Sequence, residues 1–334
     1  LVSTTHQRGP MDLATLCVLL LGISFAFFNG FHDAGITVGN IVATHGLNPR
    51  VALAMATGFN FVGALLGQGI ATVIATEVAN FPHSSTQLLA VLGGGLAGAL
   101  LVNVATYFMA VPIASTHVLM GGLVGAWLVV GWDDRPSIMF DETIVSIFIM
   151  PIVALFASIV LTRVVLRVVA SYPPKPLFKR CRQVNSVMVA GLSLAHGSQD
   201  AQKIGAVMGL VWVSGVHPGA EVVMDGRPWI LIVLTAVALA AGTWFSGWRV
   251  ARTVSVSMVR LDPVTSVISN TTSAVFLSLA AFVFRLPASM SFVVVASNLG
   301  TARRRQDIRL RPLMKVIAAW ILGIPAASCV AALF

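Results

Sequence analysis

The chain has 334 residues, of which 57% are hydrophobic and 10% are charged, and its mean hydropathy is +0.90. Soluble domains carry about 25% charged residues. The composition therefore excludes a soluble globular protein and indicates an all-α polytopic membrane protein. Lys and Arg number 21 against 12 Asp and Glu. Because this excess lies in a few short segments, it indicates cytoplasmic loops, and we expect no nucleic-acid partner.

The chain begins with a polar stretch and then a first membrane-length segment. Residues 1–12 lack an apolar core, so we expect a polar leader outside the membrane domain. The apolar residues 13–28 lead directly into the cluster Asn29-Gly30-Phe31-His32-Asp33, with no charged loop between them. An ionised Asp in hydrocarbon costs several kcal/mol unless it is paired or hydrated. We therefore expect a break in the helix at 30–33, within the membrane or at its edge.

The next apolar runs predict spans at about 51–76 and 88–111, and then Pro112 interrupts the pattern. Ser115, Thr116 and His117 follow this proline. A proline that opens a short helix with hydroxyl and imidazole side chains is typical of a discontinuous or re-entrant helix. An acidic loop at 133–142 and a span at about 144–165 complete this half.

A basic segment divides the chain. Between Arg163 and Arg182 there are six Lys or Arg residues and no acid. Since cytoplasmic loops retain Lys and Arg, this predicts a basic cytoplasmic linker at 171–186, which joins a first membrane repeat at 13–170 to a second at 187–334.

The second half repeats the features of the first. Residues 196–203 form a polar cluster around Asp200, spans follow at 229–245 and 264–283, and Pro287 then interrupts the pattern before a terminal helix. Asp33 and Asp200 are 167 residues apart, and Pro112 and Pro287 are 175 apart. This recurrence indicates an internal duplication, and paired interruptions in corresponding positions point to the substrate site of a transporter. Helix N-termini there attract anions, and C-terminal carbonyls attract cations.

At these residues the chain resembles the inorganic phosphate transporter (PiT) family, especially its bacterial members. Residues 29–33 resemble the first family signature, 196–203 the second, and 112–117 its Pro-x-Ser-Ser/Thr-Thr-His segment. The resemblance extends from about residue 13 to 334. It implies an inverted repeat, a site at the membrane midplane, and symport of inorganic phosphate with H⁺ or Na⁺ across the bacterial cytoplasmic membrane.

The resemblance also implies roles for particular residues. Those expected to bind the substrate are Ser115, Thr116, Ser289, Ser291 and Gln202. Those expected to serve the coupling cation are Asp33, Asp200, His32 and Gln199. No cofactor and no resident metal are implied, although the substrate can be a divalent metal–phosphate complex. Membrane lipid is the expected surrounding, and a homo-oligomer stays open.

Other interpretations of these residues remain. Asp200 could form only an ion pair with Lys203 on the same helix, and Ser115 or Thr116 could bond back to their own helix. His32 is either a proton relay or a polar side chain with a local partner. Because a His beside a carboxylate titrates near neutral pH, His32 favours H⁺ over Na⁺ as the coupling ion.

The sequence departs from the family pattern mainly in the second half. Ile36 and Gln199 each stand where a signature usually has Asn, while Asn270, Met290 and Phe292 stand where many members carry Glu, Ser or Thr, and His. One alternative is therefore a degenerate paralogue that binds anion without transport, in which restoring the usual residues should raise transport only if the scaffold is merely weakened. The other is a sulfate permease of the same family. No HExxH, GxSxG or P-loop occurs, so an enzyme is not expected.

Overall fold

The computed structural model describes residues 12–66, 85–130, 141–216 and 229–334. The predicted leader and most of the predicted acidic loop lie outside these ranges. Within them the chain is helical apart from turns and one isolated antiparallel bridge between Val259 and Ile308. The α-helices are α1 (Leu13–Ala43), α2 (Pro49–Leu66), α4 (Ser85–Phe108), α5 (Ser115–Val130), α6 (Asp141–Val168), α7 (Pro174–Val216), α8 (Trp229–Phe245), α9 (Trp248–Arg252), α10 (Pro263–Ser278), α11 (Met290–Gly300) and α12 (Leu310–Ala331).

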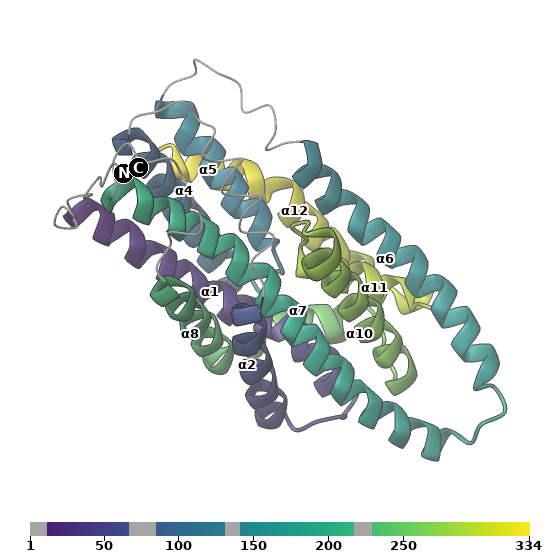
Figure 1. Cartoon of the computed structure of the whole chain (residues 1–334). Helices are drawn as coiled ribbons and strands as arrows, with labels where there is room; N and C mark the ends of the chain where they lie inside the picture. Colours follow the sequence, from purple (N-terminus) through teal and green to yellow (C-terminus); the bar gives the residue numbers. More distant parts are fainter. Residues whose placement is uncertain (1–11, 67–84, 131–140, 217–228) are drawn as a thin grey trace.

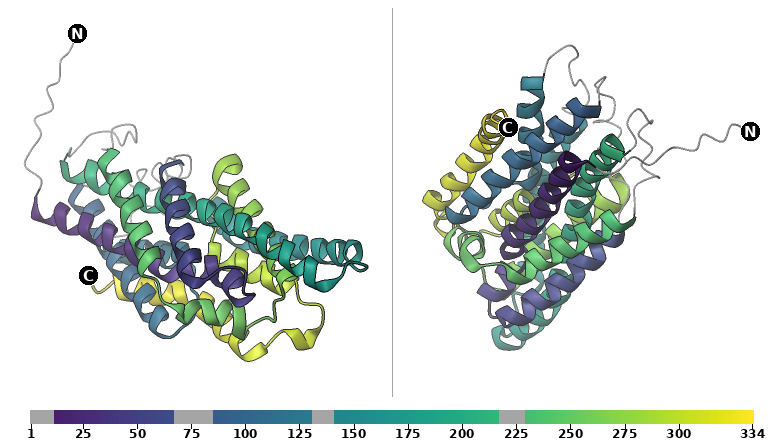
Figure 2. Two further views of the ribbon diagram at one scale, coloured as in Figure 1. Left: turned by 90° about the horizontal axis from the view of Figure 1, so that it is seen from below. Right: turned by 90° about the vertical axis from the view of Figure 1, so that its left-hand side faces the viewer.

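The helices pack side by side as a membrane bundle (Figures 1 and 2). Six of those described are long and apolar enough to cross a membrane, or seven if α8 and the α9 segment, bent by 63°, form one span. A span takes about 20 residues, so α5 with 16 residues and α11 with 11 cannot cross alone. The all-α polytopic prediction is confirmed.

The helices that carry the two Asp residues are unbroken. The predicted break at 30–33 is wrong, because α1 continues through the polar cluster for 31 residues. Helix α7 likewise runs for 43 residues through Asp200, and it extends along the length of the molecule (Figure 1). The polar side chains of both clusters find partners on neighbouring helices, so the backbone keeps its own hydrogen bonds. Residues of the predicted linker from Pro174 onward belong to α7.

The two proline segments do interrupt their helices, as predicted. Helix α4 ends at Phe108 and α5 begins at Ser115, while α10 continues as the π-helical turn Leu279–Phe284 and α11 begins at Met290. Each pair forms a hairpin that turns inside the bundle, and the hydroxyl of Ser291 in the second hairpin donates to the carbonyl of Ile113 in the first at 2.8 Å. The tips of the two hairpins therefore meet.

The open ends of the two hairpins lie at opposite ends of the molecule. Helix α12 connects them: its first turn is fixed beside the start of α10, where the Arg309 N–H donates to the Met258 carbonyl at 3.0 Å. Its far end lies against α4, where a Cβ on Gly94 would touch the Ala331 carbonyl. One hairpin thus enters the bundle from each side, which is the arrangement that an inverted repeat requires.

One end of the bundle is basic. Arg182 at the start of α7 donates to the Thr44 carbonyl after α1 at 3.1 Å, and Arg303 beyond α11 bonds Asp262 at the start of α10 at 2.6 Å. The Arg and Lys residues of the α6–α7 connection and of the segment before α12 therefore gather at this end. The positive-inside rule favours this end as the cytoplasmic one, and we refer to it as the cytoplasmic end.

Two helix crossings are copies of each other. A Cβ on Gly30 of α1 would overlap the Leu239 carbonyl of α8, and a Cβ on Gly197 of α7 would overlap the Asn60 carbonyl of α2. Gly30 and Gly197 occupy equivalent places in the two signatures. Without a side chain, each lets its helix approach the neighbouring backbone closely, which is how helices gain packing energy in lipid.

Replacing Gly63 with Ala is expected to destabilise the protein by about 1–3 kcal/mol, because the new methyl group would overlap the Leu194 carbonyl of α7. The matched control is Gly58→Ala in the same helix, since a Cβ there meets no atom within 4 Å. Thermal unfolding in detergent measures both. A Gly63→Ala melting temperature no lower than that of Gly58→Ala would contradict the close crossing.

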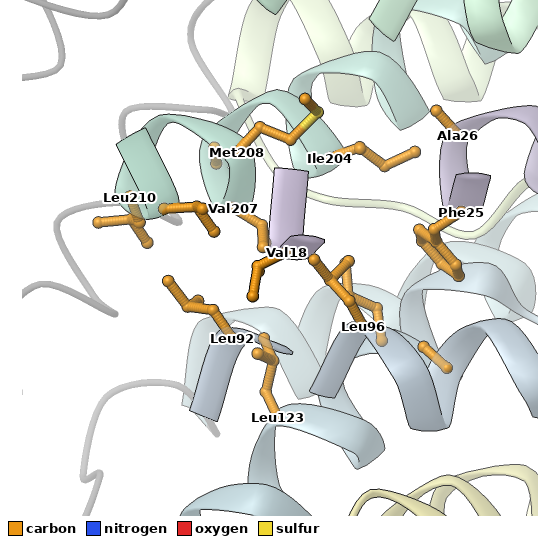
Figure 3. Close-up of a cluster of buried hydrophobic side chains, with 14 of the residues drawn as sticks. Val18, Phe25, Ala26, Leu92, Leu96, Leu123, Ile204, Val207, Met208 and Leu210 are labelled. Carbon is orange, nitrogen blue, oxygen red and sulfur yellow. The ribbon is translucent and has the colours of Figure 1, made fainter. Parts of the chain in front are cut away.

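An apolar cluster closes the bundle between the hairpin tips and the end opposite the basic one. It joins α1, α4, α5 and α7, and Figure 3 shows its side chains pointing toward one another. The side chains labelled there include Val18, Leu92, Leu96, Leu123, Ile204, Val207 and Met208. All of them are at most 9% exposed. Burial of apolar side chains is favourable by about 25 cal/mol per Å², so separating these side chains costs free energy. We call this cluster the apolar seal.

The cytoplasmic half of the bundle is closed by amides instead. Asn40 of α1 donates to the side-chain oxygens of Asn270 on α10 at 2.9 Å and Asn298 on α11 at 2.8 Å. Asn270 in turn donates to Asn185 of α7 at 2.8 Å, and Ser269 donates to Asn298 at 2.6 Å. All five side chains are at most 1% exposed. We call these five residues the amide network.

Candidate functional site

The two Asp residues of the repeated signatures come together in the centre of the bundle. Asp33 on α1 and Asp200 on α7 are 1% and 2% exposed. His196, one turn before Asp200, places its Nε2 3.1 Å from Asp200 Oδ2 and 3.9 Å from Asp33 Oδ2. One imidazole nitrogen thus lies within reach of both carboxylates, and the three groups offer ligand atoms within 4.8 Å of one another.

The orientation of the His196 ring is fixed from the opposite side. Asn60 of α2 donates its amide to the Thr243 hydroxyl at 2.9 Å, so its oxygen faces His196 Nδ1 at 3.1 Å. The proton of a neutral imidazole then lies on Nδ1. Nε2 then presents a lone pair to the two carboxylates, and a proton on Nε2 would bond Asp200 Oδ2, 3.1 Å away. Asp33 Oδ2 has no hydrogen-bond partner among the described residues. These three groups form a candidate site for a proton or a metal cation, which we call the cation site.

Lys203 connects the carboxylates to both hairpin tips. Its Nζ donates to Asp200 Oδ1 at 2.9 Å, to the Thr116 hydroxyl of α5 at 2.8 Å, and to the Ala288 carbonyl before α11 at 2.7 Å. The residue is 2% exposed. A buried ammonium is tolerated when it is paired and fully hydrogen-bonded, as it is here.

Two helix N-termini converge at this point. Helix α5 begins with Ser115 and Thr116, and the hydroxyl of Ser115 lies 3.5 Å from Asp200 Oδ2. Helix α11 begins after Ser289, whose side chain caps the N–H of Phe292. Unpaired N–H groups and the positive end of the helix dipole make such N-termini anion sites.

The other predicted site residues lie around this centre. His32 Nδ1 is 3.0 Å from Asp33 Oδ1. Gln199 holds the second hairpin tip: it accepts from the Ala288 N–H at 3.1 Å and donates to two backbone carbonyls of the α10–α11 hairpin. Gln202 donates to Ser198 one turn earlier, at 2.8 Å, on the face of α7 away from Asp200.

The residues of the second half that depart from the family pattern are packed against other side chains. Phe292 lies between His117 and Trp320, with ring centroids 4.5 and 3.8 Å away. Met290 accepts a hydrogen bond from the Thr37 hydroxyl at 3.3 Å. Asn270 belongs to the amide network. The side chains that replace the usual family residues have therefore become parts of the surrounding packing.

A small cavity lies between the hairpin tip and α7. It is lined by Phe25, Asn29, Ser115, Thr116, Asp200 and Lys203, among others, and has a volume of about 10 Å³. This is room for roughly one water molecule. The conformation is thus closed around the centre, and a larger anion would need the hairpin tips to separate.

Asn29, His196 and Lys203 lie in clusters recognised from the sequence, but neither they nor Asn60 are among the predicted site residues. Asn29 donates to Asp200 Oδ2 at 2.8 Å. The signal for two of them was available: on a helix with 3.6 residues per turn, positions 196, 200 and 203 share one face. Asn60 could not be found that way, because its contact with His196 joins residues 136 positions apart.

Paired hairpins that enter from opposite sides and meet at buried carboxylates define a membrane transporter built from inverted repeats. The family model described as the phosphate transporter family matches the chain twice, at residues 29–186 and 173–331. The chain belongs to this family. It is accordingly a multi-pass membrane transporter and not an enzyme.

Individual relatives agree. A probable low-affinity inorganic phosphate transporter of Mycobacterium leprae is 30% identical over 323 residues, which are 95% of this chain and 76% of the relative. The Bacillus subtilis protein of the same description is 26% identical over 325 residues, 96% of either chain. A solved structure titled "The sodium-dependent phosphate transporter" has a TM-score of 0.85 at 17% identity, covering 96% of this chain and 98% of that one. It shares the fold.

Proposed function

We propose that the chain is a secondary transporter that carries inorganic phosphate into the cell together with H⁺. Membership of the phosphate transporter family supports the substrate, as do the names of the relatives. The observation that carries the proposal is the cation site formed by His196, Asp33 and Asp200, because one imidazole and two carboxylates attract a cation and the site adjoins the two converging helix N-termini.

Phosphate would bind where the hairpin tips meet. Ser115, Thr116, Ser289 and Ser291 would supply hydroxyls there, because α5 and α11 both begin at these tips. Lys203, already bonded to Thr116, would turn toward the anion once the tips separate. The arrangement offers donors from both repeats, so each side of the phosphate would be held by one hairpin.

Formal charges favour one proton for each phosphate monoanion. With His196 neutral, the two carboxylates and Lys203 leave the centre with one negative charge. A proton on Nε2 removes that charge, and a phosphate monoanion restores it. The empty and loaded centres then carry the same net charge, so neither conformational step moves a different charge through a low-dielectric interior.

The nitrogen ligand separates the candidate cations. Na⁺, as a hard cation, binds oxygen ligands, whereas imidazole nitrogen suits protons and transition metals. His196 therefore favours H⁺, or a divalent metal that travels with phosphate as part of the substrate. Na⁺ remains the rival because the solved structure that shares the fold is titled sodium-dependent. His32, beside Asp33, would be a second proton acceptor.

Uptake of ³²P-phosphate into proteoliposomes is expected to follow an imposed inward pH gradient, and not a Na⁺ gradient. Asp33→Asn should abolish uptake, because the variant removes one carboxylate of the cation site. Excess unlabelled sulfate, which cannot be protonated near neutral pH, should leave uptake unchanged. Uptake driven by Na⁺ alone would overturn the coupling ion, and strong inhibition by sulfate would overturn the substrate.

Binding without uptake would have a different meaning. If phosphate protects the protein against thermal unfolding, yet neither gradient drives uptake, the chain binds anion without carrying it. That result would contradict the transport proposal. It would match the degenerate-paralogue alternative raised by Asn270, Met290 and Phe292.

A further inference from the structure

A second polar site lies at the cytoplasmic end, well away from the carboxylates. A pocket of about 430 Å³ opens where the last turns of α6 face the segment that follows α11. Its polar lining comes from Thr162, Arg163 and the run Arg303, Arg304 and Arg305, and its apolar walls come mainly from Ile159, Leu166, Leu299 and Ile308. In Figure 1, α6 lies at the edge of the bundle beside α11.

The charge in this pocket is not balanced by the protein. Arg303 is paired with Asp262 at 2.6 Å. Arg163, Arg304 and Arg305 are exposed, and they form no ion pair with the described residues. Beside them the Thr162 side chain is 5% exposed, and its hydroxyl has no hydrogen-bond partner in the part of the chain that the structure describes. Three guanidinium groups and an unpaired hydroxyl in one pocket favour the binding of an anion.

The exposed apolar residues beside the pocket indicate which kind of anion would bind there. Above the pocket, on the same side of α6, Phe156 and Val160 are 62% and 58% exposed, and Ile152 is 53% exposed. On a helix these positions line up in one stripe with Arg163. The surface therefore offers cations at the membrane boundary and a continuous apolar strip leading into the hydrocarbon. A dissolved phosphate ion would use only the cations.

We propose that this pocket binds the headgroup of an anionic phospholipid of the cytoplasmic leaflet, with an acyl chain lying along the exposed face of α6. Basic pockets between membrane helices on the cytoplasmic side suit such headgroups. The phosphate of the lipid lies among Arg163, Arg304 and Arg305, and the Thr162 hydroxyl donates to a headgroup oxygen. The inference does not depend on what the protein transports.

A lipid bound in this pocket would contact both α6 and the segment that follows α11. The Ser158 hydroxyl of α6 donates to the Ser297 carbonyl of α11 at 2.7 Å, and a Cβ on Gly300 would touch the Leu155 carbonyl. The pocket continues this α6–α11 contact outward. A lipid that binds both α6 and the segment after α11 holds the returning arm of the second hairpin, whose other end begins at Ser289 in the centre.

Native mass spectrometry of the detergent-solubilised protein, titrated with phosphatidylglycerol or phosphatidylcholine, tests the site. Wild type is expected to retain phosphatidylglycerol in preference to phosphatidylcholine. Replacing Arg163, Arg304 and Arg305 together by Gln should weaken phosphatidylglycerol binding roughly tenfold or more, since each surface cation attracts anionic lipid. Phosphatidylcholine binding should not change.

The matched control removes three cations from the same end, outside the pocket, through Lys175→Gln, Lys179→Gln and Arg311→Gln. It should bind phosphatidylglycerol as wild type does. Equal weakening in both triple variants would mean a diffuse charge effect and would overturn the site. Displacement of the lipid by millimolar inorganic phosphate would overturn the lipid assignment in favour of a free anion. Thermal unfolding of both variants verifies that each is folded.

Discussion

Replacing Asp200 with Asn is expected to reduce phosphate uptake about 100-fold or more and to destabilise the protein by about 3 kcal/mol. The carboxylate accepts from Lys203 at 2.9 Å and from Asn29 at 2.8 Å, and it lies 3.1 Å from His196 Nε2. The Asn oxygen can still accept from Lys203, but the buried ammonium loses its counter-charge and keeps only neutral partners, including the Thr116 hydroxyl and the Ala288 carbonyl. Uptake in proteoliposomes and thermal unfolding in detergent measure the two effects.

A double variant separates the structural role of Asp200 from its role in transport. Asp200→Asn combined with Lys203→Met removes both charges, so most of the lost stability should return. Uptake should stay absent, because the cation site beside His196 still lacks the Asp200 carboxylate. If the double variant transports phosphate at a rate near that of wild type, Asp200 serves only to neutralise Lys203, and the coupling site must be sought elsewhere.

Replacing Asn298 with Ala is expected to destabilise the closed conformation by about 2–3 kcal/mol. The Asn298 side chain accepts from Asn40 at 2.8 Å and from Ser269 at 2.6 Å, and it donates back to Asn40 at 3.2 Å. Its removal leaves two buried polar groups with missing partners, at about 1–3 kcal/mol for each. A lower melting temperature, together with faster cysteine labelling from the cytoplasmic side at a Ser273→Cys reporter, measures the change; Ser273 is a buried α10 residue outside the amide network.

The neighbouring residue provides the control. Ser297 is equally buried, but its hydroxyl has no partner among the residues that the structure describes, so Ser297→Ala removes none of the hydrogen bonds seen there. This variant should melt at or slightly above the wild-type temperature, and it should not change labelling at the reporter. Equal destabilisation by Ser297→Ala and Asn298→Ala would mean that side-chain volume, and not the amide network, holds this end closed.

The fold class and the hairpins could be predicted from local sequence. Composition required membrane helices, and Pro112 and Pro287, followed by Ser and Thr, required interrupted ones. The break predicted at Asp33 failed for a physical reason. A polar cluster signals either an interrupted backbone or a continuous helix whose side chains are satisfied by neighbours, and only the fold shows that Asn29 reaches Asp200 on α7.

The pairing of Asp33 with Asp200 followed from the internal repeat, but the chemistry between them did not. That chemistry depends on His196, whose ring is oriented by Asn60 and so by the packing of α2 on α7. In the same way Gln199, expected beside a coupling ion, holds the second hairpin tip through Ala288. Sequence identifies which polar residues lie in the membrane. Which of them face one another depends on helix crossings such as that of Gly197 and Asn60.

The contrast between the apolar seal on one side of the centre and the amide network on the other has a thermodynamic consequence. Opening the apolar side exposes side chains such as Leu92 and Leu96 to water, which raises the heat capacity. Opening the amide side wets polar groups, which lowers it. The equilibrium between the two open forms therefore carries a heat-capacity difference. Since apolar contacts weaken on cooling, a lower temperature is expected to favour opening of the apolar side over opening of the amide side.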